Sequence, residues 1–412
     1  MIELIGIVAF PISFLLLRWL PDRGIALSIP LGMVIAAYLS WVLSYTHIVP
    51  ADGFGPALSL IIIAIPSIYI FCRHRKQIVQ HLQSHIWLIV VTQLIFLALF
   101  SLWTLYRFYD PSISHTEQPM DMALLSASVR TEFAPPEDPW LRGESISYYY
   151  FGYWIIAFCS NLVNIKPSIA YNLALSLIPA ITSIGVIGLV YNIIKIDGGK
   201  IKFAIFAGLI SSMVLLASSN FEGVLEFLRF NGIGSESFWD WLSIDGITGP
   251  IVNLTDSWRP TEFWWWWRAT RVINTFENGV GLDYTIHEFP LFSTLLGDLH
   301  PHFLSLPFVM LFLGLVTNFA LSQRIMLPGL TLISNLPIKK VIVNYATAFR
   351  NNGSQLIFIG FILGALGFIN TWDLPIFGLV FVGVVFFKIY KDHGLSILDI
   401  LIRALPILVI VF

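Results

Sequence analysis

Charged residues and cysteines are scarce in this sequence. Of its 412 residues, 12% are charged and 2 are cysteines, whereas soluble domains carry roughly 25% charged residues. Cys72 and Cys159 both lie in apolar runs, which excludes a disulfide framework and a zinc site built from cysteine pairs. The net charge is -2 and there is no basic tract, so nothing indicates a nucleic-acid partner. The scarcity of charge indicates an integral membrane protein.

Long apolar runs take the place of charge. Hydrophobic residues make up 57% of the chain, and the mean hydropathy is +0.79. A membrane-spanning helix needs about 20 mostly apolar residues. Runs of this kind occupy residues 2–20, 24–48, 56–72, 86–106, 148–165, 168–194, 201–218, 303–321, 355–370, 374–390 and 395–412. None alternates like a barrel strand, so we predict an all-α fold: a polytopic transmembrane helical bundle with about 10–11 membrane segments.

Lysine and arginine in the loops predict the orientation of the bundle, because they concentrate on the cytoplasmic side of membranes. Basic residues gather at 18–23, 73–76, 195–202, 324–350 and 388–391. All of these are cytoplasmic if the N-terminus lies outside, which leaves loops 107–147, 219–302 and 371–373 outside. We therefore expect a multi-pass protein of the cell membrane, with an external N-terminus and two large external loops.

The number of crossings is ambiguous at one place. Residues 148–165 and 168–194 lie between an external loop and a cytoplasmic one, where an odd number of crossings is required. Either one of the two segments is re-entrant or lies along the interface, or the second is a pair of short helices broken near Pro179. The residue pattern alone leaves both arrangements open.

The chain is expected to divide into two regions. N-terminal transmembrane helices occupy residues 1–106, and a membrane core with the two large loops occupies residues 107–412. The first apolar run has neither a basic start nor a cleavage site, so we expect a retained helix and not a signal peptide. Residues 404–412 form an apolar run with no polar cap, and we expect the protein to continue past residue 412.

The first large loop is acidic and offers three carboxylates as candidate catalytic groups. Asp121 stands near the start of a predicted short helix over residues 122–130, so it either caps that helix or acts as a base, and the two roles are compatible. The proline-rich turn PPEDPW at 135–140 presents Glu137 and Asp138 side by side. Asp121, Glu137 and Asp138 are therefore the predicted catalytic residues.

Three consecutive tyrosines, Tyr148, Tyr149 and Tyr150, follow this loop at the start of an apolar run. Aromatic residues at such a place ordinarily form an interfacial belt. Neighbouring helical residues point in different directions, so at least one hydroxyl is expected to face the protein interior and to need a partner there. We treat all three as candidate substrate-binding residues.

The second large loop is rich in tryptophan, with four in a row ending at Trp267 and followed by Arg268 and Arg271. Interfacial anchoring with arginines on lipid headgroups is one interpretation. The other is that the indole rings bind a sugar or cover a lipid tail while an arginine binds a phosphate. These three residues are also candidates for substrate binding.

The loop ends in a stretch that holds two carboxylates and two imidazoles, EFPLFSTLLGDLHPH at 288–302. Pro301 favours an extended conformation at His300, so that His300 and His302 can reach one ion together with Asp298. This mixed donor set suits Mn²⁺, Mg²⁺ or Zn²⁺. The alternative is a cluster that caps the next helix through Asp298 or His300.

Two further carboxylates are candidate substrate-binding groups. Glu288 opens the polar stretch and can supply an oxygen ligand or a base. Asp373 lies in a tight external turn, where it either completes the site or caps its own helix. Ionisable groups at membrane depth cost roughly 2.5–3.5 kcal/mol each on insertion scales, so such a cluster is rarely idle. We expect the two large loops to form one active site.

Together these motifs resemble the uncharacterised "YYY" membrane proteins of Chloroflexi and archaea (domain of unknown function 2298). The matching stretches are PMD at 119–121, PPEDPW at 135–140, YYYFG at 148–152, WWWR at 265–268, EFP at 288–290, GDLHPH at 297–302 and NTWD at 370–373. The resemblance covers roughly residues 106–390.

In layout this family is similar to integral-membrane glycosyltransferases of the GT-C type. Those enzymes are polytopic, use lipid-phosphate sugar donors and carry a catalytic Asp or Glu on an acidic first external loop, and some bind a divalent metal. The similarity implies Asp121 or Asp138 as the base. Here the acidic loop follows the fourth apolar segment and not the first, which suggests added N-terminal helices or a more distant relationship.

The function expected from these observations is an inverting glycosyltransferase with a polyprenyl-phosphate-linked sugar as donor and membrane lipid as its surroundings. A membrane transporter or lipid flippase is the alternative, and it predicts charged residues in the middle of broken helices. A non-catalytic membrane scaffold is the third hypothesis, although it does not need clustered aspartate and histidine at one face.

Overall fold

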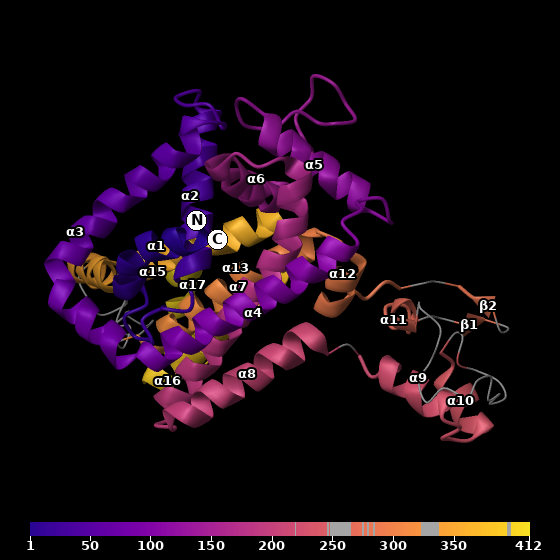
Figure 1. The fold of residues 1–412 in the computed structure, drawn as a ribbon. Helices are drawn as coiled ribbons and strands as arrows, with labels where there is room; N and C mark the ends of the chain where they lie inside the picture. Colours follow the sequence, from indigo (N-terminus) through magenta and orange to yellow (C-terminus); the bar gives the residue numbers. More distant parts are fainter. Residues whose placement is uncertain are drawn as a thin grey trace. The chain divides into compact units, whose positions relative to one another are not determined.

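The computed structural model describes residues 1–412 apart from 219, 245–246, 248–264, 274–275, 278–279, 283–284, 323–337 and 394–396, and without the side chains of 265–266, 276–277, 280–281, 338–352 and 393. In chain order the elements are α1 (Ile2–Leu16), α2 (Ser28–Tyr45), α3 (Phe54–Ser84), α4 (Ile86–Tyr109), α5 (Gln118–Arg130), α6 (Phe151–Val163), α7 (Pro167–Ile196), α8 (Ile201–Ala217), α9 (Glu222–Phe230), α10 (Glu236–Leu242), α11 (Trp265–Arg268), β1 (Phe276–Glu277), β2 (Val280–Gly281), α12 (Pro290–Leu296), α13 (Pro301–Leu321), α15 (Ile338–Ile369), α16 (Asp373–His393) and α17 (Ile397–Val411) (Figure 1).

The all-α, polytopic fold prediction is confirmed. Six helices of the described residues are long and apolar enough to cross a membrane, namely α2, α3, α4, α7, α13 and α16. The pair α8 and α9, bent by 75°, is a seventh candidate span, and α1, α6 and the last part of α15 are shorter apolar helices. In the part of the chain that is described, β-structure other than isolated bridges is limited to the antiparallel pair β1 and β2.

The chain divides into two compact units. The first comprises Met1–Ser212 and Leu299–Phe412, and the second comprises Met213–Asp298. The expected division into regions at residue 106 remains a prediction. The second unit is built around Trp239 on α10, which is fully buried and packs with Ile244 and Ile247.

The first unit has a buried centre and an apolar exterior. On α7, Ile178 and Ile181 are fully buried, as is Leu311 on α13, which packs against it. On α3 and α4 the apolar side chains of Ile65 and Leu94 are more than 60% exposed. Exposed apolar helix faces of this length are stable next to lipid and not next to water.

The structure excludes one of the two arrangements left open for residues 148–194. The helix α7 runs over 30 residues without a break at Pro179, so the alternative of two short helices is wrong. The helix α6 has 13 residues, which corresponds to about 20 Å of helix against a hydrocarbon core of about 30 Å. The helix α6 is thus one of the shorter apolar helices, and it packs beside α7.

The basic stretch at 73–76 was expected in a loop, but it lies within α3, which continues to Ser84 with a kink at His74. Hydropathy marks the end of an apolar run, whereas a helix can continue as a polar segment beyond it. The predicted short helix over 122–130 begins earlier than expected, and α5 starts at Gln118. Arg324, one of the residues used for the orientation, lies outside the described residues.

Candidate functional site

Asp121 lies in the first turn of α5, inside the first unit. The N-cap position of α5 is occupied by Glu117, and the backbone N–H of Asp121 already donates to the carbonyl of Glu117, at 3.1 Å. The interpretation of Asp121 as the N-cap is therefore wrong. Its side chain is fully buried and accepts a hydrogen bond from the hydroxyl of Tyr153. A buried carboxylate held by a side-chain donor indicates a site and not a cap.

Tyr153 reaches Asp121 from the first turn of α6. The preceding residue, Gly152, allows α6 to approach its neighbours closely, because a Cβ there would lie 3.0 Å from a side-chain atom of Leu304 on α13 and 3.2 Å from one of Ile369 on α15. Tyr153 itself is fully buried. The packing of α6 against α13 and α15 thus sets the direction from which the hydroxyl meets Asp121.

His300 immediately precedes α13. Its backbone is extended, with φ of -69° and ψ of 151°, as its position before Pro301 predicted. The ring Nδ1 lies 3.2 Å from a carboxylate oxygen of Glu117, and the His300 and His302 ring centroids are 5.1 Å apart. The backbone N–H of Leu299 donates to the Tyr171 hydroxyl on α7 at 3.2 Å, which ties this segment to the centre of the first unit.

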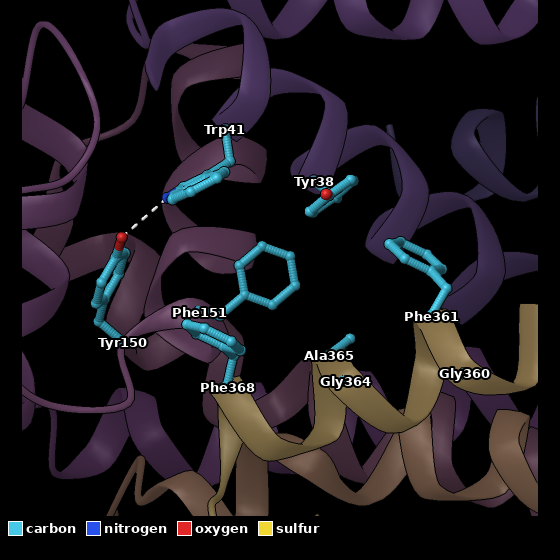
Figure 2. A pocket seen from close by; sticks show the side chains of 9 residues that line it. All are labelled: Tyr38, Trp41, Tyr150, Phe151, Gly360, Phe361, Gly364, Ala365 and Phe368. Carbon is cyan, nitrogen blue, oxygen red and sulfur yellow. Dashed lines mark hydrogen bonds between the residues drawn. The ribbon is translucent and has the colours of Figure 1, made fainter. Parts of the chain in front are cut away.

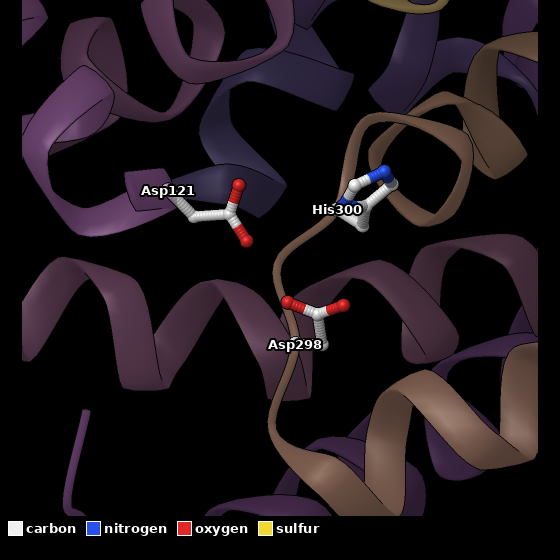
Figure 3. A group of neighbouring side chains, drawn as sticks. All are labelled: Asp121, Asp298 and His300. Carbon is white, nitrogen blue, oxygen red and sulfur yellow. The ribbon is translucent and has the colours of Figure 1, made fainter. Parts of the chain in front are cut away.

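Asp121 and His300 therefore meet inside the first unit, where a carboxylate oxygen and a ring nitrogen lie within 4.8 Å of each other (Figure 3). Asp298, drawn with them in Figure 3, is the last residue of the second unit, and the peptide chain holds it two residues from His300. The backbone N–H of Asp298 donates to the carbonyl of Ser293, at 2.9 Å. Asp121 of the first large loop and His300 at the end of the second thus lie close together.

The three tyrosines precede α6 and do not behave alike. The rings of Tyr148 and Tyr149 are stacked, with centroids 3.9 Å apart. Burial, the hydrogen bond to Tyr149 and the nearby carboxylates of Asp121 and Glu117 raise the pKa of Tyr148 well above its usual value, so its hydroxyl stays protonated. The hydroxyl of Tyr150 accepts a hydrogen bond from the Trp41 indole at 2.9 Å, which confirms that one of the three has an interior partner.

Glu137 and Asp138 do not join Asp121. Asp138 accepts hydrogen bonds from the backbone N–H groups of Trp140 and Leu141, at 2.8 and 3.1 Å, and Glu137 accepts one from Gly143 at 2.7 Å. Both line an open groove of about 510 Å³ together with Ser126 and Arg130 on one face of α5. The opposite, buried face of α5 carries Asp121, Leu124 and Ser128. Their catalytic role remains a prediction.

Asp373 is the first residue of α16 and accepts a hydrogen bond from the Asn370 side chain at 2.9 Å. This contact closes the NTWD turn on itself. Asp373 is buried, and its role in substrate binding remains a prediction.

The remaining predicted residues belong to the second unit. The Arg268 guanidinium pairs with Glu226 on α9 at 2.6 Å, and that of Arg271 lies over the Trp267 ring, 3.7 Å from its centroid. Burial lowers the pKa of Arg271, and the half-buried carboxylate of Glu288 partly opposes this shift. The tryptophan before position 265 lies outside the described residues, and the side chains at 265 and 266 are not described.

Two residues of the site were not among the sequence predictions. Glu117 is one of several acids in its loop, and Tyr153 lies in an apolar run where an aromatic residue is ordinary. The sequence signal for Tyr153 is its spacing, because it follows Tyr150 by about one helical turn and so lies on the same side of α6. Glu117 offered no such signal, because its contact with His300 depends on the packing of α13.

A family model described as "Uncharacterized membrane protein (DUF2298)" matches residues 35–410 of the chain. None of the curated proteins compared with the chain matches it, and none of the solved structures does.

Proposed function

We propose that this chain, which belongs to the uncharacterized membrane protein family DUF2298, is an integral-membrane glycosyltransferase of the GT-C type that uses a polyprenyl-phosphate-linked sugar. The observation that carries the proposal is the buried Asp121 carboxylate, held by Tyr153 beside His300 where α5, α6 and α13 begin. Burying ionisable groups beside membrane helices is costly, and they are kept there mainly for function.

The chemistry assigned to Asp121 is general-base catalysis. An acceptor hydroxyl would give its proton to the Asp121 carboxylate while its oxygen forms a bond to C1 of the sugar. The bond between C1 and the phosphate oxygen breaks on the opposite face, and polyprenyl phosphate leaves with the electron pair. A base within hydrogen-bond reach of the acceptor is what such an inverting displacement requires. The Tyr153 hydrogen bond fixes the rotamer of Asp121 for this transfer.

The same residues fit a divalent cation. Carboxylate and imidazole donors suit Mn²⁺, Mg²⁺ or Zn²⁺, and one such atom of Asp121 and one of His300 lie within 4.8 Å of each other. Asp121, Asp298 and His300 would hold the ion, and Glu117 would orient the His300 ring through Nδ1. Such an ion would stabilise the charge of the leaving phosphate.

We place the site on the external face, in keeping with the distribution of basic residues. The Glu117 side chain is 58% exposed, whereas that of His300 is 22% exposed. A water-borne acceptor would therefore approach from the side of Glu117. Tyr148 and Tyr149 would contact the sugar, and the substrate-binding roles of Trp267, Arg268 and Arg271 in the second unit remain predictions.

The proposal is tested by donor turnover. The full chain in lipid nanodiscs is incubated with a panel of polyprenyl-phosphate pentoses, hexoses and N-acetylhexosamines, with water and glycerol as acceptor hydroxyls, and free polyprenyl phosphate is measured by mass spectrometry. We expect release that falls by about 10²–10⁴-fold in Asp121→Asn and is unchanged in Asp52→Asn, an exposed loop carboxylate. Loss in Asp138→Asn alone would move the base to the open groove. Release from none of the donors would overturn the proposal in favour of transport or a scaffold.

A further inference from the structure

A second feature of the first unit is an aromatic cavity of about 260 Å³ between α2, α6 and α15 (Figure 2). Its walls include Tyr38 and Trp41 of α2 and Phe361 and Phe368 of α15. The rings of Tyr38 and Phe361 meet edge to face with centroids 5.0 Å apart, and those of Tyr38 and Trp41 are stacked at 6.3 Å. Such mutual packing holds the walls in place before any ligand arrives. We call this cavity the aromatic groove.

The aromatic groove opens outward and is apolar. Tyr38 is 43% exposed and Phe368 is 64% exposed, so the groove opens on the exposed apolar surface of the helices. The polar atoms at one end, the Trp41 indole nitrogen and the Tyr150 hydroxyl, are hydrogen-bonded to each other at 2.9 Å (Figure 2). Because these polar atoms are already hydrogen-bonded to each other, the groove favours a hydrocarbon ligand.

The floor of the groove is made of small residues. Gly360, Gly364 and Ala365 lie on α15, across the cavity from Tyr38 and Trp41 of α2 (Figure 2). A Cβ at Gly360 would lie 2.8 Å from the carbonyl oxygen of Val411, so this glycine is required by packing against α17. A Cβ at Gly364 would meet nothing within 4 Å. The space over Gly364 is therefore open, and it is not needed for helix packing.

The groove and the carboxylate site both lie at the start of α6. Tyr150 and Phe151 line the groove, and Tyr153, one helical turn after Tyr150, donates a hydrogen bond to Asp121. Tyr148 and Tyr149, whose rings stack on each other, directly precede Tyr150. A ligand with a hydrocarbon chain in the groove would carry its polar end past the start of α6.

We propose that the aromatic groove binds the first isoprene units of the donor's prenyl chain, and that Tyr148 and Tyr149 line the passage from the groove to Asp121. The inference rests on the proposed function for its choice of a prenyl chain over a phospholipid acyl chain. It gives the three tyrosines a common role and makes the space over Gly364 a determinant of donor binding.

The test uses a matched pair of glycines. Gly364→Leu fills the groove, whereas Gly383→Leu adds the same side chain on α16 at an exposed glycine whose Cβ would also meet nothing within 4 Å. Both replace glycine in a helix by a better helix former, so both are expected to fold, which thermal unfolding checks. The probe is a polyprenyl phosphate with a diazirine on its second isoprene unit, photolysed with the full chain in phosphatidylcholine nanodiscs.

We expect cross-links to peptides that contain Trp41 or residues 361–368, reduced about tenfold in Gly364→Leu and unchanged in Gly383→Leu. Labelling of the same peptides by a diazirine phosphatidylcholine, with equal competition by the two lipids, would identify a bulk-lipid site and overturn the inference. Cross-links elsewhere would overturn it too. Because labelling needs no turnover, donor release without groove labelling contradicts only this inference, and groove labelling without release contradicts only the transferase.

Discussion

The hydroxyl of Tyr153 on α6 donates a hydrogen bond to the carboxylate of Asp121 on α5, and both side chains are fully buried. This contact joins the acidic loop to the helix that follows the three tyrosines. It is also the contact through which packing of α6 against α13 and α15 sets the position of the carboxylate.

Removing the donor hydroxyl is expected to destabilise the protein. Tyr153→Phe keeps the ring but leaves the buried Asp121 carboxylate without this partner, which costs about 1.5–3 kcal/mol for a hydrogen bond to a charged group. Tyr150→Phe is the control, because its hydroxyl accepts from a neutral indole, and it is expected to cost about 0.5–1.5 kcal/mol. Unfolding in mixed micelles measures both. Equal losses of stability in the two variants would show that Asp121 is protonated or that other groups hold its carboxylate.

Metal binding is expected to depend on both Asp121 and His300. Mn²⁺ titrated into the full chain and followed by electron paramagnetic resonance should bind, and Asp121→Asn and His300→Gln should abolish binding. Glu117→Gln should weaken it by about 10–100-fold, the usual cost of removing a group that orients a ligand histidine. His81→Gln is the control, since that ring contacts the backbone carbonyl of Asp22. Unaltered affinity in His300→Gln would refute this donor set.

Gly152 is expected to tolerate no branched side chain. Gly152→Val brings a Cβ to 3.0 Å from Leu304 and 3.2 Å from Ile369 and adds two methyl groups beyond it. Such overpacking costs about 1–3 kcal/mol and would move Tyr153 away from Asp121. Gly383→Val, at an open position, should change stability little. Equal thermal unfolding of the two variants would mean that α6 can shift without cost.

The second unit is expected to lose stability as the pH rises. Burial, with a smaller contribution from Glu226 and against the opposing charge of Arg268, raises the pKa of Glu222 to about 9. Between about pH 5 and that value, the folded chain keeps a proton that the unfolded chain has lost, so unfolding becomes easier with each step in pH.

The unfolding midpoint in micelles, measured from pH 5 to 9, tests this. Glu222→Gln should flatten the profile, whereas Glu236→Gln, at an exposed position on α10, should leave it unchanged. A wild-type midpoint that rises over this interval would show that Glu222 is ionised in the folded protein.

Hydropathy was sufficient to predict the helical membrane fold, because apolar runs of the required length have few other uses. It was weakest at helix ends. The polar continuation of α3 to Ser84 and the unbroken path of α7 through Pro179 are decided by packing, which the residue pattern does not contain. The bond that proline removes costs less when the helix is buried among others, as α7 is.

The site was predictable in part for a similar reason. Asp121 and His300 stand out because charged groups are rare in this chain, and Pro301 predicted the extended backbone at His300. The partnership of Asp121 with Tyr153, and of His300 with Glu117, required knowledge of how α5, α6 and α13 pack. Asp138 belongs to the same acidic loop as Asp121, yet it lines a groove on the other face of α5.

The most direct measurement is a cryo-electron microscopy structure of the full chain in nanodiscs with Mn²⁺ and a polyprenyl-phosphonate C-glycoside, which is an uncleavable donor analogue. The account predicts C1 of the sugar within reach of Asp121, the phosphonate beside His300 and the first isoprene units in the aromatic groove. A phosphonate bound at the opposite ends of these helices, or with its sugar away from Asp121, would contradict it.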